Sequence, residues 1–180
     1  IRIQFIHPTE RLTMTTISAQ APETSTLFHL TWLQGLLHTS SDSILTVARW
    51  TLGLVILPHG LQKTVGWFGG YGFSSTMSFF TQQMEIPAVL ALLAILAESA
   101  GAVALLVGAL TRVAAFGIGV VMAAATATVH VGNGFFMNWS GTQAGEGFEY
   151  HLLAGGLAAI LMLRGGGRWS ADRFIRTRLR

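Results

Sequence analysis

Residues 87–109 read PAVLALLAILAESAGAVALLVGA, and this stretch decides the fold class. About 20 mostly apolar residues are enough to cross the hydrocarbon core of a bilayer as a helix, and Glu98 is the one charged residue here. Three further apolar runs, at residues 43–62, 111–131 and 148–163, repeat the pattern, although the last is short for a span. The sequence therefore predicts an all-α protein built as a bundle of four transmembrane helices.

The composition excludes an ordinary water-soluble domain. Of the 180 residues, 51% are hydrophobic and 11% are charged, whereas soluble domains carry about 25% charged residues. The isoelectric point near 10.2 reflects a basic C-terminal run, because six of the eleven Lys and Arg residues lie at residues 164–180. A basic cluster directly after a span faces anionic headgroups, so the predicted partner is the lipid bilayer and not nucleic acid.

The basic residues also predict an orientation. Arg112 lies in the short turn between the second and third spans, whereas the long loops at residues 63–86 and 132–147 share a single lysine, Lys63. Basic residues next to spans favour the cytoplasmic side. Both termini and the short turn are therefore expected in the cytoplasm, and the long loops on the outer side.

The chain divides into three predicted parts. Residues 1–42 form an N-terminal extension, in which residues 27–38 (LFHLTWLQGLLH) are apolar but too short to span, as is typical of a helix lying in the membrane interface. Residues 43–164 form the four-helix domain, and residues 165–180 form a basic cytoplasmic tail. Met14 opens a run that reads like a protein start, and no basic segment or cleavage site indicates a signal peptide.

The chain has no cysteine. This excludes disulfides, thiol redox chemistry, Cys-ligated zinc and iron–sulfur clusters carried by its own side chains. A redox role would therefore need a quinone, another bound cofactor or a partner subunit. No intrinsic cofactor is predicted, and quinone is the candidate.

Two charges fall inside the predicted spans. Arg49 lies about 9 Å from the cytoplasmic start of the first helix, and Glu98 lies about 13 Å from the same side of the membrane. At these depths the two side chains are near enough to form a buried ion pair. Such a pair would either neutralise both charges and set the helix register, or take part in proton or quinone chemistry.

A second polar group is predicted at the outer ends of the helices. His59 and Lys63 share one face of the first helix, His130 ends the third, and Glu149 and His151 begin the fourth. These side chains would be interfacial polar tips, or they would bind a quinone headgroup and move its protons. Haem ligation by His59 and His130, or a His/Glu metal site, are further alternatives, but no metal-ligand motif is present and no metal is predicted.

Several motifs together resemble the DoxX family of small four-helix membrane proteins. The resemblance spans residues 43–172 and rests on these residues: Arg49-x-x-x-Gly53, His59-Gly60-x-x-Lys63, Glu98, Leu106-x-Gly108-x-x-Thr111-Arg112, His130, Gly147-Phe148-Glu149, and Gly165-Gly166-Gly167 followed by Asp172. It implies links to thiosulfate:quinone oxidoreduction or to membrane oxidoreductase complexes in oxidative-stress defence.

Three functions follow as hypotheses. The first is a membrane subunit of a quinone-linked oxidoreductase complex, in which the outer cluster of His59, Lys63, His130 and Glu149 contacts quinone or a redox partner. The second is a non-catalytic anchor or accessory subunit of a larger complex, with other membrane or peripheral redox subunits as partners. The third is a transporter of small solutes or protons. In each case the expected location is the bacterial cytoplasmic (inner) membrane, which the chain crosses several times.

Overall fold

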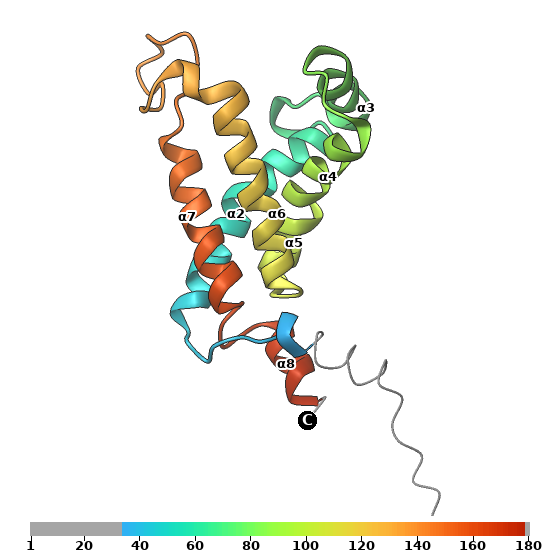
Figure 1. The fold of residues 1–180 in the computed structure, drawn as a ribbon, viewed down its shortest axis with the longest axis vertical. Coiled ribbons are helices and arrows are strands. Elements are labelled where there is room, and N and C mark those ends of the chain that lie inside the picture. The colour runs from blue at the N-terminus through green and yellow to red at the C-terminus, as the bar shows by residue number, and fades with distance from the viewer. Residues whose placement is uncertain (1–33, 179–180) are drawn as a thin grey trace, which may run out of the picture.

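The computed structural model describes residues 34–178, which form seven α-helices and no strand (Figure 1). This confirms the all-α class. The helices are α2 (Ile44–Thr64), α3 (Gly72–Ser78), α4 (Ala88–Glu98), α5 (Ala100–Val107), α6 (Thr111–Ala125), α7 (Glu149–Arg164) and α8 (Ala171–Arg178). Shorter helical turns adjoin them: the 3-10 helices η1 (Trp67–Gly69) and η4 (Val131–Asn133), and the π-helices η2 (Phe79–Gln83) and η3 (Thr126–His130).

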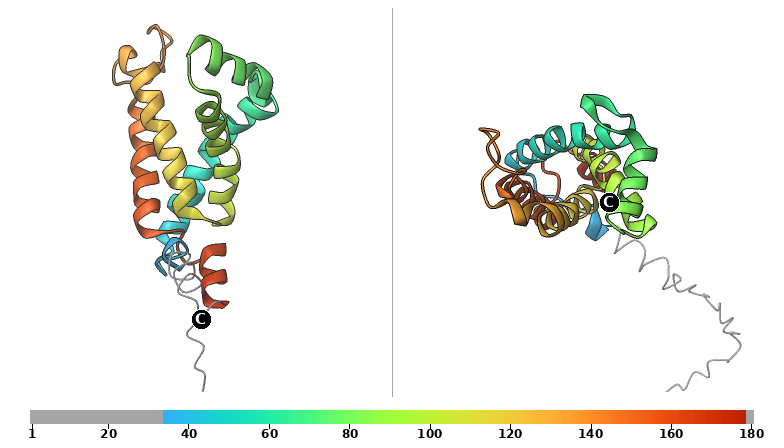
Figure 2. Two further views of the ribbon diagram at one scale, coloured as in Figure 1. Left: turned by 45° about the vertical axis from the view of Figure 1, so that its right-hand side comes forward. Right: turned by 90° about the horizontal axis from the view of Figure 1, so that it is seen from above.

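Four columns make the bundle: α2, the α4–α5 pair, α6 and α7 (Figure 2). α2 packs along α5, and both α4 and α5 contact α6. α6 packs along α7, and α7 contacts α2, so the four columns close into a ring. Its centre is filled by small and branched apolar side chains that are at most 1% exposed, including Leu52, Ile56, Ala115, Ile118 and Leu161.

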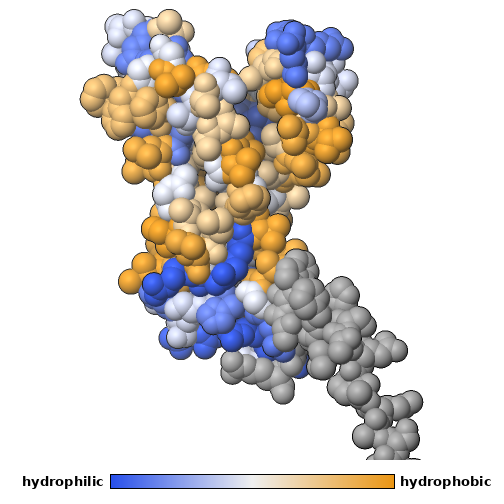
Figure 3. All heavy atoms as spheres, in the orientation of Figure 1, coloured by the Kyte–Doolittle hydropathy of each residue, from blue (hydrophilic) through white to orange (hydrophobic). Residues whose placement is uncertain are grey.

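Large apolar side chains also cover the outside of the ring. Ile44, Val89 and Leu153, which lie on three different columns, are 69–72% exposed. Figure 3 shows hydrophobic residues over the middle of the bundle and hydrophilic residues gathered at both of its ends. A helical bundle whose outer surface is apolar as well as its centre suits contact with lipid. The chain is therefore a membrane protein.

Three helical stretches of the described chain are long and apolar enough to cross a membrane: Ile44–Thr64, Ala88–Val107 and Thr111–Asn133. The predicted fourth span corresponds to α7, a helix of 16 residues. At 1.5 Å per residue it is about 24 Å long, which is shorter than the ~30 Å hydrocarbon core. Four helical columns are thus present, and the crossing of the membrane by α7 stays a prediction.

The end of the bundle that carries the α5–α6 turn and α8 is called the base, and the end that carries residues 65–87 and 134–148 is called the mouth (Figure 1). The α5–α6 turn is tight, as its length predicts. Gly108 ends α5 in the left-handed conformation (φ 74°), and its N–H bonds to the carbonyls of Ala104 and Leu105.

The base is locked by the C-terminal segment. Asp172 accepts hydrogen bonds from the backbone N–H groups of Leu110 (2.6 Å) and Thr111 (2.9 Å), which begin α6. Its own backbone N–H donates to the carbonyl of Gly108. Because the first N–H groups of a helix have no partner within the helix, this buried carboxylate caps α6 and ties α8 to the α5–α6 turn.

Part of the predicted N-terminal organisation lies outside the described residues. Met14 and residues 27–33 of the predicted interfacial helix belong to that part. Within the described part, residues 34–36 are helical, and Leu37 is 3% exposed against the base of the bundle. The interfacial helix stays a prediction.

Candidate functional site

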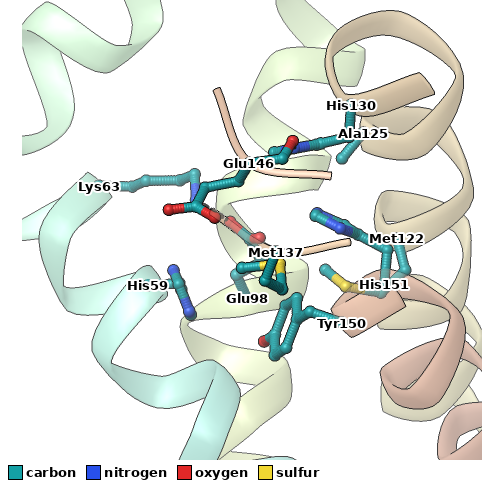
Figure 4. A pocket seen from close by; sticks show the side chains of 10 residues that line it. All are labelled: His59, Lys63, Glu98, Met122, Ala125, His130, Met137, Glu146, Tyr150 and His151. Carbon is teal, nitrogen blue, oxygen red and sulfur yellow. Dashed lines mark hydrogen bonds and ion pairs between the residues drawn. The ribbon is translucent and has the colours of Figure 1, made fainter. Parts of the chain in front are cut away.

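A cavity of about 250 Å³ opens at the mouth between the α2–α4 side and the α6–α7 side of the bundle (Figure 4). Its wall is rich in side chains that carry exchangeable protons, with methionines and one alanine between them. The lining residues are His59, Lys63, Glu98, Met122, Ala125, His130, Met137, Glu146, Tyr150 and His151.

α2 supplies His59 and Lys63 to the cavity. Their spacing of four residues places them on one face of the helix, as predicted. Gly60 lies between them and packs directly on the junction of α4 and α5, where a Cβ would clash with the carbonyl of Glu98 and the Cα of Ser99. Only a glycine lets α2 approach this junction so closely, and the approach brings Lys63 to Glu98.

Glu98 lies where the second membrane column breaks. α4 ends at Glu98, Ser99 has φ −94° and ψ −76°, and α5 begins at Ala100. The hydroxyl and the backbone N–H of Ser99 both donate to the carbonyl of Ile95 (2.6 and 3.0 Å), an arrangement that often accompanies a bend in a helix. The carboxylate of Glu98 forms an ion pair with the ammonium of Lys63 at 2.5 Å.

His130 reaches the cavity because α6 ends in a π-turn. Ala125 and His130 both line the cavity although they are five residues apart, which is the hydrogen-bond spacing of the π-helix η3. Nδ1 of His130 lies 2.8 Å from the carbonyl oxygen of Glu146. Since a carbonyl can only accept, Nδ1 carries the proton, and Nε2 of the neutral imidazole is an acceptor.

α7 supplies Tyr150 and His151. The ring of His151 lies 4.0 Å from that of His130 and 5.2 Å from that of Tyr150, and the Tyr150 ring lies 5.9 Å from that of His59. The Tyr150 hydroxyl and Nδ1 of His151 are buried and have no hydrogen-bond partner among residues 34–178. Buried polar atoms are rarely left unpaired, so these two atoms mark a place for a ligand or water.

The loop at residues 134–148 covers one side of the cavity. The backbone carbonyl of Glu146 accepts hydrogen bonds from Nδ1 of His130 and from the side-chain amide of Asn133 (3.1 Å). Its carboxylate accepts from the backbone N–H of Asn138 (2.6 Å). The Glu149 carboxylate accepts from the N–H of Met137 (3.0 Å) and from the indole of Trp139 (3.3 Å). Both acids therefore hold the loop in place.

The structure brings three of the four residues of the predicted outer cluster to one cavity, namely His59, Lys63 and His130. Glu149 does not line it, because its carboxylate is bound to the loop. Glu146, Tyr150 and Glu98 were not assigned to this cluster. For Tyr150 a signal was available, because it adjoins His151 at the same helix start. Glu146 has no such signal, since its place depends on the path of the loop.

The predicted ion pair of Arg49 with Glu98 is not formed. Glu98 packs against Gly60, eleven residues along α2 from Arg49, so about 16 Å separates the two levels. Arg49 is completely buried at the base and donates to four backbone carbonyls, those of Leu105, Leu106, Gly166 and Trp169. The depth estimate from the sequence failed because it measured both helices from assumed membrane edges.

Metal ligation is not favoured by the arrangement of the described side chains. Within residues 34–178, no three His, Asp or Glu residues lie close enough together to hold a metal ion. The ring of His151 lies against that of His130, so an axial ligand at His130 would compete with this packing. The cavity is better suited to hydrogen bonding, because Tyr150, His151 and Lys63 can donate, while Glu98 and Nε2 of His130 can accept.

Comparison with known proteins adds one match. A family model described as DoxX matches residues 44–131, from the start of α2 to the first residue of η4. This confirms the resemblance predicted from the sequence, over the part of the chain that carries His59, Lys63, Glu98 and His130. No curated protein and no solved structure matches the chain.

Proposed function

We propose that this membrane protein, whose residues 44–131 form a DoxX domain, binds a quinone headgroup in the mouth cavity as a subunit of a quinone-linked oxidoreductase complex. The observation that carries the proposal is the pair of unpartnered polar atoms in the cavity wall, the Tyr150 hydroxyl and Nδ1 of His151. A quinone headgroup offers two carbonyl oxygens, and each can accept a hydrogen bond from such a group.

The size and surroundings of the cavity support this fit. Its volume of about 250 Å³ lies below the about 300–1,000 Å³ of pockets that enclose a drug-sized ligand. A single ring can enter, whereas a long isoprenoid tail must leave between the helices toward the lipid. Met122, Met137 and Ala125 supply apolar contact for the ring between the polar groups.

Each polar residue has a distinct task in this proposal. Tyr150 and His151 donate hydrogen bonds to the headgroup and set its position. His130, held by the Glu146 carbonyl, adds an acceptor at Nε2 that suits the hydroxyl of a reduced headgroup. Quinone itself supplies the capacity to accept and release electrons and protons. Because the chain has no cysteine, we assign the electron donor to a partner subunit.

One observation favours a second candidate, the anchor or accessory subunit. Tyr71 and Trp139 lie in the two segments that flank the mouth and are 85% and 87% exposed. Exposed aromatic side chains are typical of binding surfaces as well as of the membrane interface. In this alternative the cavity binds no quinone, and a stoichiometric partner co-purifies from native membranes.

The test is quinone binding by the purified protein. Decylubiquinone is titrated into protein in mild detergent, and binding is followed by quenching of tryptophan fluorescence. Tyr150→Phe and His151→Ala should each weaken binding about two- to tenfold, because each removes one hydrogen bond. His38→Asn is the matched control, since His38 is exposed at the base. Absence of binding by the native protein, or equal affinity in all variants, contradicts the proposal.

A further inference from the structure

Glu98 occupies an unusual position for a carboxylate. It is the one acidic residue in α2, α4, α5 and α6, and it is 5% exposed. A buried carboxylate in a membrane helix is costly unless a counter-ion or a proton neutralises it. Here the counter-ion is the ammonium of Lys63, whose nitrogen lies 2.5 Å from a carboxylate oxygen of Glu98.

The two partners are not equally enclosed. The side chain of Lys63 is 24% exposed and that of Glu98 is 6% exposed. Lys63 lies in the last turn of α2 at the mouth, and its long flexible side chain reaches inward to the carboxylate (Figure 4). The ammonium can therefore swing out to water at the mouth, whereas Glu98 cannot follow it.

Loss of the counter-ion would change the state of Glu98. Left alone in an enclosed site, an ionised carboxylate is unfavourable, and it takes up a proton. The remaining titratable groups of the cavity are His59 on α2, His130 at the end of α6, Tyr150 and His151 on α7, and Glu146 in the loop. Of these, Glu146 is held by the N–H of Asn138 and His130 by a carbonyl.

We infer that Glu98 carries protons between the mouth and the cavity, with Lys63 as its displaceable counter-ion. When the ammonium moves away, the carboxylate takes a proton from water at the mouth. When the ammonium returns to a headgroup that the partner subunit has reduced, the proton passes to a headgroup oxygen, an O–H bond forms there, and Glu98 is ionised again. The electrons come from the partner subunit. This inference rests on the proposed quinone site, because the headgroup is the proton's destination.

The experiment labels Glu98 with dicyclohexylcarbodiimide, a hydrophobic reagent that reacts with protonated carboxyl groups in membranes. The adduct is quantified by peptide mass spectrometry in the native protein and in Lys63→Met. Labelling should rise at least about tenfold in Lys63→Met, because the buried counter-ion is gone. Glu149 is the internal control, since its carboxylate accepts hydrogen bonds from the backbone N–H of Met137 and the indole of Trp139 and does not contact Lys63. Glu98→Gln identifies the labelled position.

A second measurement avoids dependence on one variant. In the native protein, labelling of Glu98 should increase as the pH falls, and decylubiquinone at saturating concentration should decrease it. Labelling of Glu98 that stays at the level of Glu149, both in Lys63→Met and across the pH series, overturns the inference. Labelling that decylubiquinone does not alter, although it binds, also overturns it and leaves the quinone site standing. Failure of the quinone proposal is recognised separately, by the absence of decylubiquinone binding.

Discussion

At the scale of single residues, the two buried charges Glu98 and Arg49 are stabilised in different ways. Glu98 forms an ion pair with Lys63. Arg49 has no acidic partner within hydrogen-bond reach among the described residues, and backbone carbonyls surround its guanidinium. Two of them, from Leu105 and Leu106, belong to the end of α5, where the carbonyls lack partners within the helix and the helix dipole is negative. Arg49 thus closes α5 and joins it to the Gly-rich segment before α8.

The first prediction concerns Arg49→Lys. Lysine keeps the charge but has three donors at one point, whereas the planar guanidinium donates in several directions. At least one buried carbonyl would lose its partner, so the free energy of unfolding should fall by about 1–3 kcal/mol. The measurement is thermal unfolding in detergent, with Arg168→Lys as the control, because Arg168 is exposed. Equal stability of the two variants would show that the Arg49 network contributes little.

The residues of the cavity differ in how far the sequence predicted them. The presence of His59 and Lys63 in one cavity follows from a spacing of four residues within one helix. The pairing of Lys63 with Glu98 depends instead on the close contact of Gly60 with the α4–α5 junction. Contacts of this second kind join different helices, and no spacing along the chain encodes them.

At the scale of elements, the helices that carry the cavity residues of segment 44–131 each contain a special feature. α2 is continuous but contains Pro58, which cannot donate a backbone hydrogen bond. The second column breaks at Ser99, and α6 continues into the π-turn η3. The π-turn lets Ala125 and His130, five residues apart, line the same cavity.

The second prediction tests the π-turn as the device that aims His130. Deletion of the exposed Ala127 should convert η3 into an α-turn and keep His130 on the cavity face, because residues four apart share a face of an α-helix. Insertion of an alanine after Ala127 should rotate His130 by about 100° away from it. Since the chain has no cysteine, cysteines at His130 and His151 report this geometry through a short thiol cross-linker.

The expected result is cross-linking in the native background and in the deletion variant, and its loss in the insertion variant. Membrane insertion of all three proteins serves as the control. Equal cross-linking after the insertion would show that the π-turn does not determine the direction of His130.

At the scale of the whole molecule, the bundle has two unlike ends. The base is basic and closed by buried hydrogen bonds, with Asp172 and Arg49 as its fixed points. The mouth holds the cavity and is flanked by exposed aromatic residues, among them Tyr71 and Trp139. This polarity agrees with a site that faces one side of the membrane while the other side carries the structural lock.

The third prediction concerns the membrane crossing of α7. If α7 spans, the loop before it and helix α8 after it lie on opposite sides of the membrane. Thr142→Cys and Thr177→Cys place single reactive groups at exposed positions in the loop and in α8. An impermeant maleimide added to intact cells should label Thr142→Cys alone, and Thr177→Cys only after permeabilisation. Labelling of both from outside would mean that α7 does not cross.

The sequence by itself predicted the helical class, four spans of which the structure supports three, the tight α5–α6 turn and the shared face of His59 and Lys63. Each of these rests on local information: the length of an apolar run, the few residues between two runs, or the periodicity of one helix. The DoxX resemblance also followed from motifs read along the chain, and the family model confirms it for residues 44–131.

The tertiary structure alone decided which charges meet. In the structure Glu98 forms an ion pair with Lys63, and Arg49 donates hydrogen bonds to backbone carbonyls at the base. The carboxylate of Glu149 accepts hydrogen bonds from the loop and does not line the cavity. The physical reason is that contacts between helices depend on their relative height, their breaks and the close approach permitted at Gly60. None of these is a property of a single helix, so hydropathy and spacing could predict the columns but not the pairs between them.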